Sequence, residues 1–162
     1  MARIIVVMGV AGSGKTTVGS ALADRLGIGF EDGDRLHPPE NIEKMARGVP
    51  LTDADREPWL LRLEEWMDSV LTTGASGVLA CSGLRRAYRE KLREGRSVRL
   101  VFLRVSRDVA ADRLRTRAGH FFRADLLNSQ FAALEEPGAD EEIRVVDATL
   151  PVAEMVDRLA DL

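Results

Sequence analysis

The chain has 162 residues, of which 45% are hydrophobic and 30% charged, and its formal net charge is −3 at pH 7. This length and composition suit one globular domain with a buried core, and the slightly acidic balance argues against a dedicated nucleic-acid binder. The one cysteine excludes an internal disulfide and suits a reducing compartment, and no apolar run is long enough to span a membrane. We therefore expect one cytoplasmic domain over residues 1–162, with neither nucleic acid nor membrane as a partner.

The chain opens with an apolar, strand-like run over residues 4–8, followed by a glycine-rich turn and an amphipathic helical segment that ends before Gly27. The turn, residues 9–16, reads GVAGSGKT and fits G-x-x-x-x-G-K-[ST], the phosphate-binding loop. Glycines let backbone N–H groups approach phosphates closely, and the next helix directs its positive N-terminal end at the anion. A glycine-rich turn without a ligand is the alternative, but the strand–loop–helix context favours nucleotide binding.

In this loop we expect Lys15 to place its ammonium group on the β- and γ-phosphates of ATP, with a catalytic role, and the Thr16 hydroxyl to bind Mg²⁺. ATP and Mg²⁺ are thus the expected cofactors. The expected ATP-binding set is Gly9, Val10, Ala11, Gly12, Ser13, Gly14, Lys15, Thr16 and Thr17.

A second strand over residues 28–32 ends in Asp32-Gly33-Asp34. At a strand end beside the phosphate loop, one carboxylate can reach the Mg²⁺ shell, the role we give Asp32. The other can accept a hydrogen bond from an attacking hydroxyl, the role we give Asp34. An ordinary Asp-Gly turn is the alternative; the neighbouring phosphate loop favours function.

The middle of the chain reads as helical. A short helix is expected over residues 39–47, and Thr52 can cap a turn with Asp55. Pro58 suits the first turn of a longer helix. The apolar stripe on that helix is interpreted as core and not as a ligand platform, because helical spacing alone explains it. Its members are Trp59, Leu60, Leu63, Trp66, Met67 and Val70.

The second half continues the alternation of strands and helices. Strands are expected at 77–82, 98–105 and 143–147, and helices around 84–93, 106–114, 125–134 and from Pro151 to the end. This pattern predicts an α/β fold with an open five-stranded parallel sheet and helices on both faces. Ligands then bind at the carboxyl ends of the strands.

Arg113 and Arg117 lie one helical turn apart and can face the same side. Beside a glycine and two phenylalanines, they suggest a mobile cover that lays positive charge over the transferring phosphoryl group. A solvated charged helix is an equal alternative. The histidines, His37 and His120, have no metal-site spacing with Cys81 and are expected to bind a polar substrate or to be structural.

These stretches together resemble the gluconokinase family of small P-loop sugar-acid kinases, nearly from end to end. The similarity is carried by the phosphate loop and by residues 32–38, 41–45, 51–60, 81–84, 88–89, 117–122, 130–131 and 134–141. Arg85 and Arg86 stand where family members suggest lysines, and arginine is not an equivalent donor.

The resemblance implies transfer of the ATP γ-phosphate to the terminal hydroxyl of D-gluconate, giving 6-phosphogluconate. It also implies a three-layer P-loop kinase fold similar to shikimate and adenylate kinases. The implied substrate-binding insertion covers about residues 35–72 and the lid about 113–125. Adenine is expected near the lid helix and the loop before the fifth strand. Family members often form homodimers.

The resemblance also implies roles for individual residues. Asp34 would be the base or the orienting carboxylate for the acceptor hydroxyl, and Arg113 and Arg117 would form the catalytic lid. The implied acceptor-binding set is Asp34, His37, Lys44, Arg56, Arg89 and His120. A bidentate arginine suits a planar carboxylate, and a polyol needs several convergent polar groups.

Two other readings stay open. The first is a shikimate kinase-like or other small-molecule kinase of the same fold, which would keep the phosphate loop and Asp34 but change the acceptor. The second is a nucleotide switch without an acceptor. The sequence lacks the Asn-Lys-x-Asp motif of GTPases, and a paired carboxylate with an arginine set is superfluous to such a switch.

Overall fold

The computed structural model describes residues 1–118 and 124–162, which form a sheet of five strands flanked by helices. The strands are β1 (Ile4–Met8), β2 (Gly29–Asp32), β3 (Gly77–Ala80), β4 (Val98–Arg104) and β5 (Arg144–Asp147). The helices are α1 (Lys15–Leu26), α2 (Pro39–Ala46), α3 (Asp53–Thr72), α4 (Arg86–Arg93), α5 (Arg107–Ala118), α6 (Ala124–Ala133) and α7 (Val152–Leu159). Two short 3₁₀ helices are η1 (Gly33–Leu36) and η2 (Ala139–Glu141).

All strand pairs are parallel, and the strand order is β2-β3-β1-β4-β5. The register brings the ends of three strands level: Val7 of β1 pairs with Ala80 of β3, and Ala80 pairs with Asp32 of β2. The phosphate loop, which follows β1, and the Asp34 turn, which follows β2, therefore lie at one edge of the sheet. This confirms the predicted α/β fold.

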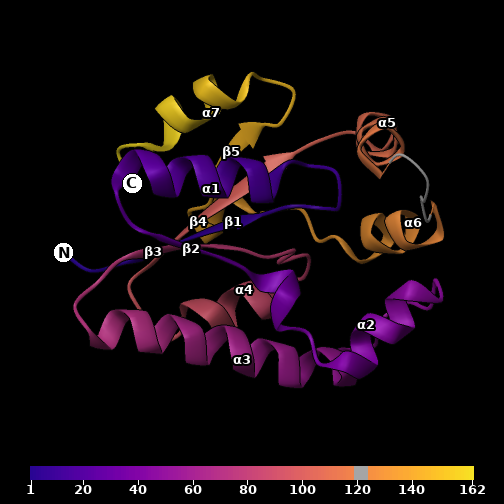
Figure 1. Cartoon of the computed structure of the whole chain (residues 1–162), viewed down its shortest axis with the longest axis horizontal. Coiled ribbons are helices and arrows are strands. Elements are labelled where there is room, and N and C mark those ends of the chain that lie inside the picture. The colour runs from indigo at the N-terminus through magenta and orange to yellow at the C-terminus, as the bar shows by residue number, and fades with distance from the viewer. Residues whose placement is uncertain (119–123) are drawn as a thin grey trace.

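Helices cover both faces of the sheet, with α1 and α7 on one side and α3 and α4 on the other (Figure 1). Two apolar clusters result. One gathers Val18 and Leu22 of α1 with Met155 of α7, and the other gathers Trp59 and Leu63 of α3. Every residue of β1 and β3 is buried, which explains their unbroken apolar runs. The helices α2, α5 and α6 gather beyond one end of the sheet (Figure 1).

Some boundaries differ from the sequence-based expectation. We had expected Pro58 in the first turn of the long helix. Helix α3 begins at Asp53, so Pro58 lies further inside it. The reason is a full capping box: the Thr52 hydroxyl accepts from the Asp55 N–H, and the Asp55 carboxylate accepts from the Thr52 N–H. Helix α5 runs to Ala118, four residues further than expected.

The predicted substrate-binding insertion, about residues 35–72, comprises α2 and α3 with the end of η1. The predicted lid, about residues 113–125, takes in the last turn of α5 and the first residues of α6, and its middle lies outside the described residues. Both remain predictions as functional units. None of the described helices is long and apolar enough to cross a bilayer.

Candidate active site

The phosphate loop joins β1 to α1 and takes a conformation that requires glycine. Gly12 and Gly14 have φ of 82° and 94°, in the left-handed region. A Cβ at Gly12 would lie 2.6 Å from the Ala110 carbonyl oxygen of α5, so a side chain would clash with backbone. The loop is thus fixed by its glycines and by its packing on α5.

Lys15, the first residue of α1, is buried, and its ammonium group forms no hydrogen bond to any residue that the structure describes. An unpaired buried charge is costly, so this position favours an anionic ligand. The loop amides and the N-terminal end of α1 are where a phosphate is held in such folds. The expected ATP-phosphate site therefore fits the geometry.

The side chains expected to bind Mg²⁺ are adjacent. The Thr16 hydroxyl donates to a carboxylate oxygen of Asp32 at 3.5 Å, and the contact is exposed. Hydroxyl and carboxylate oxygens suit Mg²⁺, which takes most of its remaining ligands from water and phosphate. Among the described residues there is no group of three or more His, Cys, Asp or Glu side chains that could hold a metal ion.

A cavity of about 520 Å³ lies beside the phosphate loop, between α5 and the segment that follows β5. Its lining includes the loop backbone, Thr17, and apolar side chains from residues 150–155. Because it adjoins the loop where the phosphates are expected, this cavity is a candidate site for the nucleoside. We had expected adenine near the lid helix and the loop before the fifth strand; this cavity borders α5 and the segment after that strand, and the position of adenine stays a prediction.

Both lid arginines line this cavity, as their helical spacing suggested. Arg113 donates to the carbonyl oxygens of Gly12 and Ser13, at 3.3 Å each, and to Ala148 O at 2.6 Å. It therefore joins α5 to the phosphate loop and to the end of β5. The stretch that follows, including His120, lies outside the described residues, so the expected role of His120 stays a prediction.

A second, smaller pocket of about 150 Å³ is lined by Ala11 and Lys15 of the phosphate loop. It brings together Lys15 of α1, Asp34 of η1, His37 just after η1, and Arg56 of α3. Further lining comes from the segment after β3 and from α6, through Ser82, Leu84, Leu126, Ser129 and Gln130. Four of the residues singled out in the sequence thus meet in one concave site.

The position of Asp34 is set by its own turn. The Asp32 carboxylate accepts from the Asp34 N–H at 3.0 Å and so caps η1. Gly33 packs against β3, where an added Cβ would lie 2.6 Å from Ala80 O. The Asp-Gly-Asp sequence is therefore both a turn and a site, since the turn holds the second carboxylate beside the phosphate loop.

Two residues of the implied acceptor set do not line this pocket. Lys44 pairs with Asp55 at 2.6 Å, and this hydrogen bond is the main reason why the pKa of Asp55 falls to about 2. Arg89 is 1% exposed and donates to both carboxylate oxygens of Glu141, at 2.8 and 2.9 Å. Its remaining guanidinium nitrogen donates to Gly83 O and Leu84 O.

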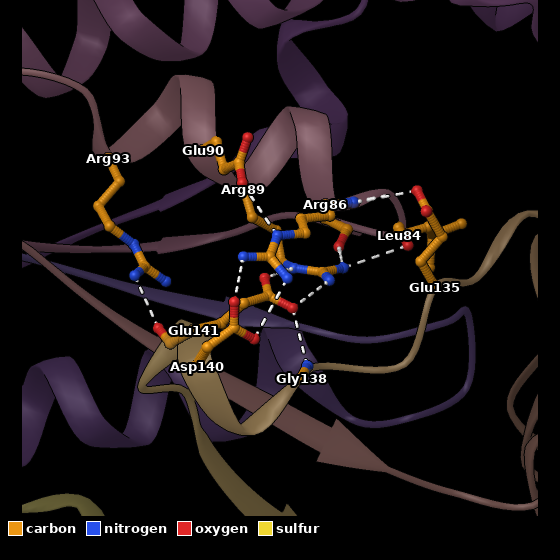
Figure 2. Close-up of polar contacts among 10 residues, drawn as sticks. Leu84, Arg86, Arg89, Glu90, Arg93, Glu135, Gly138, Asp140 and Glu141 are labelled. Carbon is orange, nitrogen blue, oxygen red and sulfur yellow. Dashed lines mark hydrogen bonds and ion pairs between the residues drawn. The ribbon is translucent and has the colours of Figure 1, made fainter.

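Figure 2 shows this arrangement, in which three arginines of α4 hold the segment that leads into β5. Arg86 pairs with Asp140 at 2.6 Å, and Arg93 donates to Glu141 O at 2.7 Å. Arg86, where lysine was expected, therefore has a structural partner. Arg89 pairs with Glu141 and does not line the pocket, so we leave it out of the acceptor-binding set proposed below.

Trp59 and Gln130 are among the pocket residues that the sequence analysis did not identify. Trp59 was interpreted as core from its spacing, and it is buried, yet it also lines the pocket. Gln130 of α6 accepts from the Ala11 N–H at 2.7 Å, so it joins the lid side of the pocket to the phosphate loop. The resemblance included residue 130 without a role, and no spacing rule points to it.

Comparisons with known proteins show which family the chain is similar to. Residues 11–142 match the family model for shikimate kinase. The chain is 52% identical to a gluconokinase of Gluconobacter oxydans, covering 87% of this chain and 80% of the relative. It is 46% identical to the thermoresistant gluconokinase of Escherichia coli, covering 95% and 89%.

Solved structures show the same relationship. A gluconokinase from Sinorhizobium meliloti superposes with a TM-score of 0.86 at 44% identity, covering 98% of this chain and 94% of that one. An unliganded sugar kinase from Janibacter superposes with a TM-score of 0.92 at 46% identity, covering 99% and 94%. A shikimate kinase from Bacteroides thetaiotaomicron, 24% identical with a TM-score of 0.66, shares the fold.

Proposed function

The chain belongs to the gluconokinase family, and from this premise we propose that it transfers the γ-phosphate of ATP to the terminal hydroxyl of D-gluconate, giving 6-phosphogluconate. The observation that carries the proposal is the pocket beside Lys15, which gathers Asp34, His37 and Arg56. A cation at the phosphates, a carboxylate near an acceptor hydroxyl and an arginine for a substrate carboxylate are the groups that this reaction needs.

On the donor side, the loop amides and the Lys15 ammonium bind the phosphates and stabilise the charge that develops as the γ-phosphoryl group moves. The ammonium is already desolvated, so little reorganisation accompanies the reaction. Thr16 and Asp32 would hold Mg²⁺, which would neutralise part of the negative charge on the phosphates. Arg113 and Arg117 line the nucleotide cavity and would add positive charge above the phosphates.

On the acceptor side, Asp34 accepts the hydrogen bond of the attacking hydroxyl and receives or orients its proton. Its turn is fixed by Asp32 and by the contact of Gly33 with β3, so the carboxylate needs little motion to reach the hydroxyl. Arg56 offers a guanidinium group for the carboxylate of the sugar acid, and His37 and Gln130 add polar contacts for its hydroxyls. His120 remains a proposed further contact.

The choice of gluconate over shikimate is supported by family membership and by the lining of the pocket. Both acceptors carry a carboxylate and hydroxyls, but gluconate is an open chain that must be held straight by several polar groups. The volume of about 150 Å³ and the polar side chains in its lining suit a small polyhydroxy acid. The test is a coupled ADP-release assay across gluconate, shikimate, glycerate and nucleoside monophosphates.

We expect kcat/KM for gluconate to exceed that for every other acceptor by about 100-fold or more, because buried polar groups left unpaired penalise a wrong acceptor. Strong turnover with another acceptor alone would contradict the assignment. If ATP bound but no acceptor were phosphorylated, the chain would be a nucleotide-binding module instead.

The setting of the enzyme is also a proposal. A cytoplasmic location is supported by the buried, unpaired thiol of Cys81, which suits a reducing compartment. A homodimer is suggested by the family resemblance alone. Light scattering of the purified protein would give its mass in solution, and a mass of about 18 kDa, close to the 17.8 kDa of the chain, would contradict the dimer.

A further inference from the structure

His37 is held on two sides within the acceptor pocket. It is 7% exposed, and its ring stacks on Trp59 with the centroids 4.5 Å apart and the planes 9° from parallel. Its Nδ1 lies 3.2 Å from the Nδ2 atom of Asn41, four residues along the chain. The other ring nitrogen, Nε2, forms no hydrogen bond to any described residue, and the residue lines the pocket.

The contact with Asn41 fixes the tautomer of His37. The Asn41 amide nitrogen also donates to the carbonyl oxygen of Asp55 at 2.8 Å, so its two hydrogens serve two acceptors. Turning the amide over would set its own oxygen against the Asp55 carbonyl, which cannot donate. Because the amide nitrogen only donates, Nδ1 must accept, and the proton of a neutral imidazole then sits on Nε2.

Trp59 fixes the plane of the imidazole ring relative to Asp34. The indole N–H of Trp59 donates to Gly33 O at 2.8 Å, and Gly33 is the residue before Asp34. Trp59 is 1% exposed and Asn41 3% exposed, so neither has room to turn. The turn that carries Asp34, the indole, the imidazole and the amide are therefore joined by one chain of contacts.

The surroundings keep the imidazole of His37 neutral. Burial is the main cause that lowers its pKa to about 4; Asp34 opposes this shift, and Arg56 adds to it. These are the charged groups that act on the ring, while Trp59 and Asn41 carry no charge. At neutral pH the ring is thus a neutral donor through Nε2, and it does not titrate in the working range.

We propose that Asn41 and Trp59 are positioning residues that hold His37 as its Nε2–H tautomer, a one-way hydrogen-bond donor to an oxygen of the sugar acid. This inference rests on the proposed function, since it names how the acceptor is recognised. A fixed neutral donor selects an acceptor oxygen at one place, while leaving the negative charge of the substrate to Arg56.

The first test is the tautomer itself, read from ¹⁵N–¹H correlation spectra of the imidazole nitrogens in the wild-type protein. The chain has two histidines, and the His37→Gln variant identifies the signals of His37 by their loss. We expect a protonated Nε2 and an unprotonated Nδ1 from pH 5.5 to 8. A proton on Nδ1 would overturn the proposal, and this readout does not depend on any acceptor being turned over.

The second test exchanges the donor at Nδ1 for an acceptor. In Asn41→Asp one carboxylate oxygen faces Nδ1, so the neutral ring must carry its proton there and Nε2 loses its hydrogen. The other carboxylate oxygen loses the hydrogen bond to the Asp55 carbonyl, a cost to stability that thermal unfolding measures separately from KM. We expect KM for gluconate to rise about 10-fold at pH 8, with KM for ATP changed by less than about 2-fold. The carboxylate also raises the pKa of His37, so at lower pH the imidazolium regains its Nε2–H and KM falls toward the wild-type value.

His37→Gln is the matched control, because its amide nitrogen can donate from nearly the same place as Nε2 and cannot titrate. We expect its KM for gluconate, and that of the double variant with Asn41→Asp, to be independent of pH. A folded Asn41→Asp enzyme whose KM stays at the wild-type value and is flat with pH would overturn the proposal. If the wild type fails to phosphorylate gluconate at all, the proposed function falls, and the spectra still decide the tautomer.

Discussion

The two halves of the active site are built from different parts of the chain. The donor half is mainly backbone: a glycine loop, the N-terminal end of α1 and an arginine that grips loop carbonyls. The acceptor half is mainly side chains, brought together from η1, α3, α6 and the segment after β3. The first depends on a conformation that only glycine allows at Gly12. The second depends on each partner being present, so single substitutions should separate the two substrates.

The largest effect is expected where the two halves meet, at Lys15. Lys15→Ala should lower kcat by about 10³-fold, because the fixed cation at the phosphates is lost. It should not destabilise the protein in the absence of ligand, since the ammonium is buried without a partner among the described residues. Steady-state kinetics and thermal unfolding measure the two effects. Lys91→Ala, at an exposed position of α4, is the control. A near-normal kcat would contradict the role of the loop.

Asp34 tests the acceptor half. Asp34→Asn keeps the shape of the side chain but removes its basicity, so kcat should fall by about 10²-fold or more. The Kd for ATP, measured by calorimetry without acceptor, should change by less than about 2-fold. Asp24→Asn, exposed on α1, should leave kcat unchanged. Should ATP affinity alone fall, Asp34 would belong to the donor half.

The donor half could be predicted from the sequence because its function lies in one contiguous motif. Backbone amides at fixed spacing do the binding, so the motif gives both the fold of the loop and its ligand. Asp32 and Asp34 could also be predicted as site residues, because few residues follow a strand that ends beside the phosphate loop. The register of β1, β3 and β2 then brought them level.

The acceptor half was only partly predicted, because contacts between distant segments leave no local signal. Arg89 looked like a ligand for a sugar acid, but a partner 52 residues away, Glu141, takes its guanidinium. Trp59 was assigned to the core by a spacing rule that holds equally for a residue that lies under a pocket. Gln130 reaches the phosphate loop across 119 residues of sequence.

The Arg89–Glu141 pair separates stability from substrate binding. Glu141→Gln leaves the guanidinium of Arg89 buried without its countercharge and should lower the free energy of unfolding at pH 7 by about 3 kcal/mol. The KM values for ATP and gluconate should stay within about 2-fold of the wild type. Urea unfolding and kinetics measure the two. A large rise in KM for gluconate, with stability unchanged, would return Arg89 to the acceptor set.

The same pair carries a pH dependence with a definite sign. The hydrogen bonds from Arg89 lower the pKa of Glu141 below its ordinary value of 4.5. Its contribution to stability is therefore present above pH 4.5 and is lost as the pH falls through the lowered pKa. The stability gap between wild type and Glu141→Gln should shrink on acidification below pH 4.5.

An exposed ion pair is the control for this buried one. Arg25→Ala removes the exposed pair with Asp157 and should lower the free energy of unfolding by less than about 1 kcal/mol.

The most direct test of the division into two halves is to measure both KM values in Arg56→Met and in Arg113→Met. Arg56 lines the acceptor pocket and Arg113 grips the phosphate loop. We expect Arg56→Met to raise KM for gluconate about 10-fold and KM for ATP by less than about 2-fold, and Arg113→Met to do the reverse. If both variants raised the KM of the same substrate, the two pockets would not be the separate donor and acceptor sites described above.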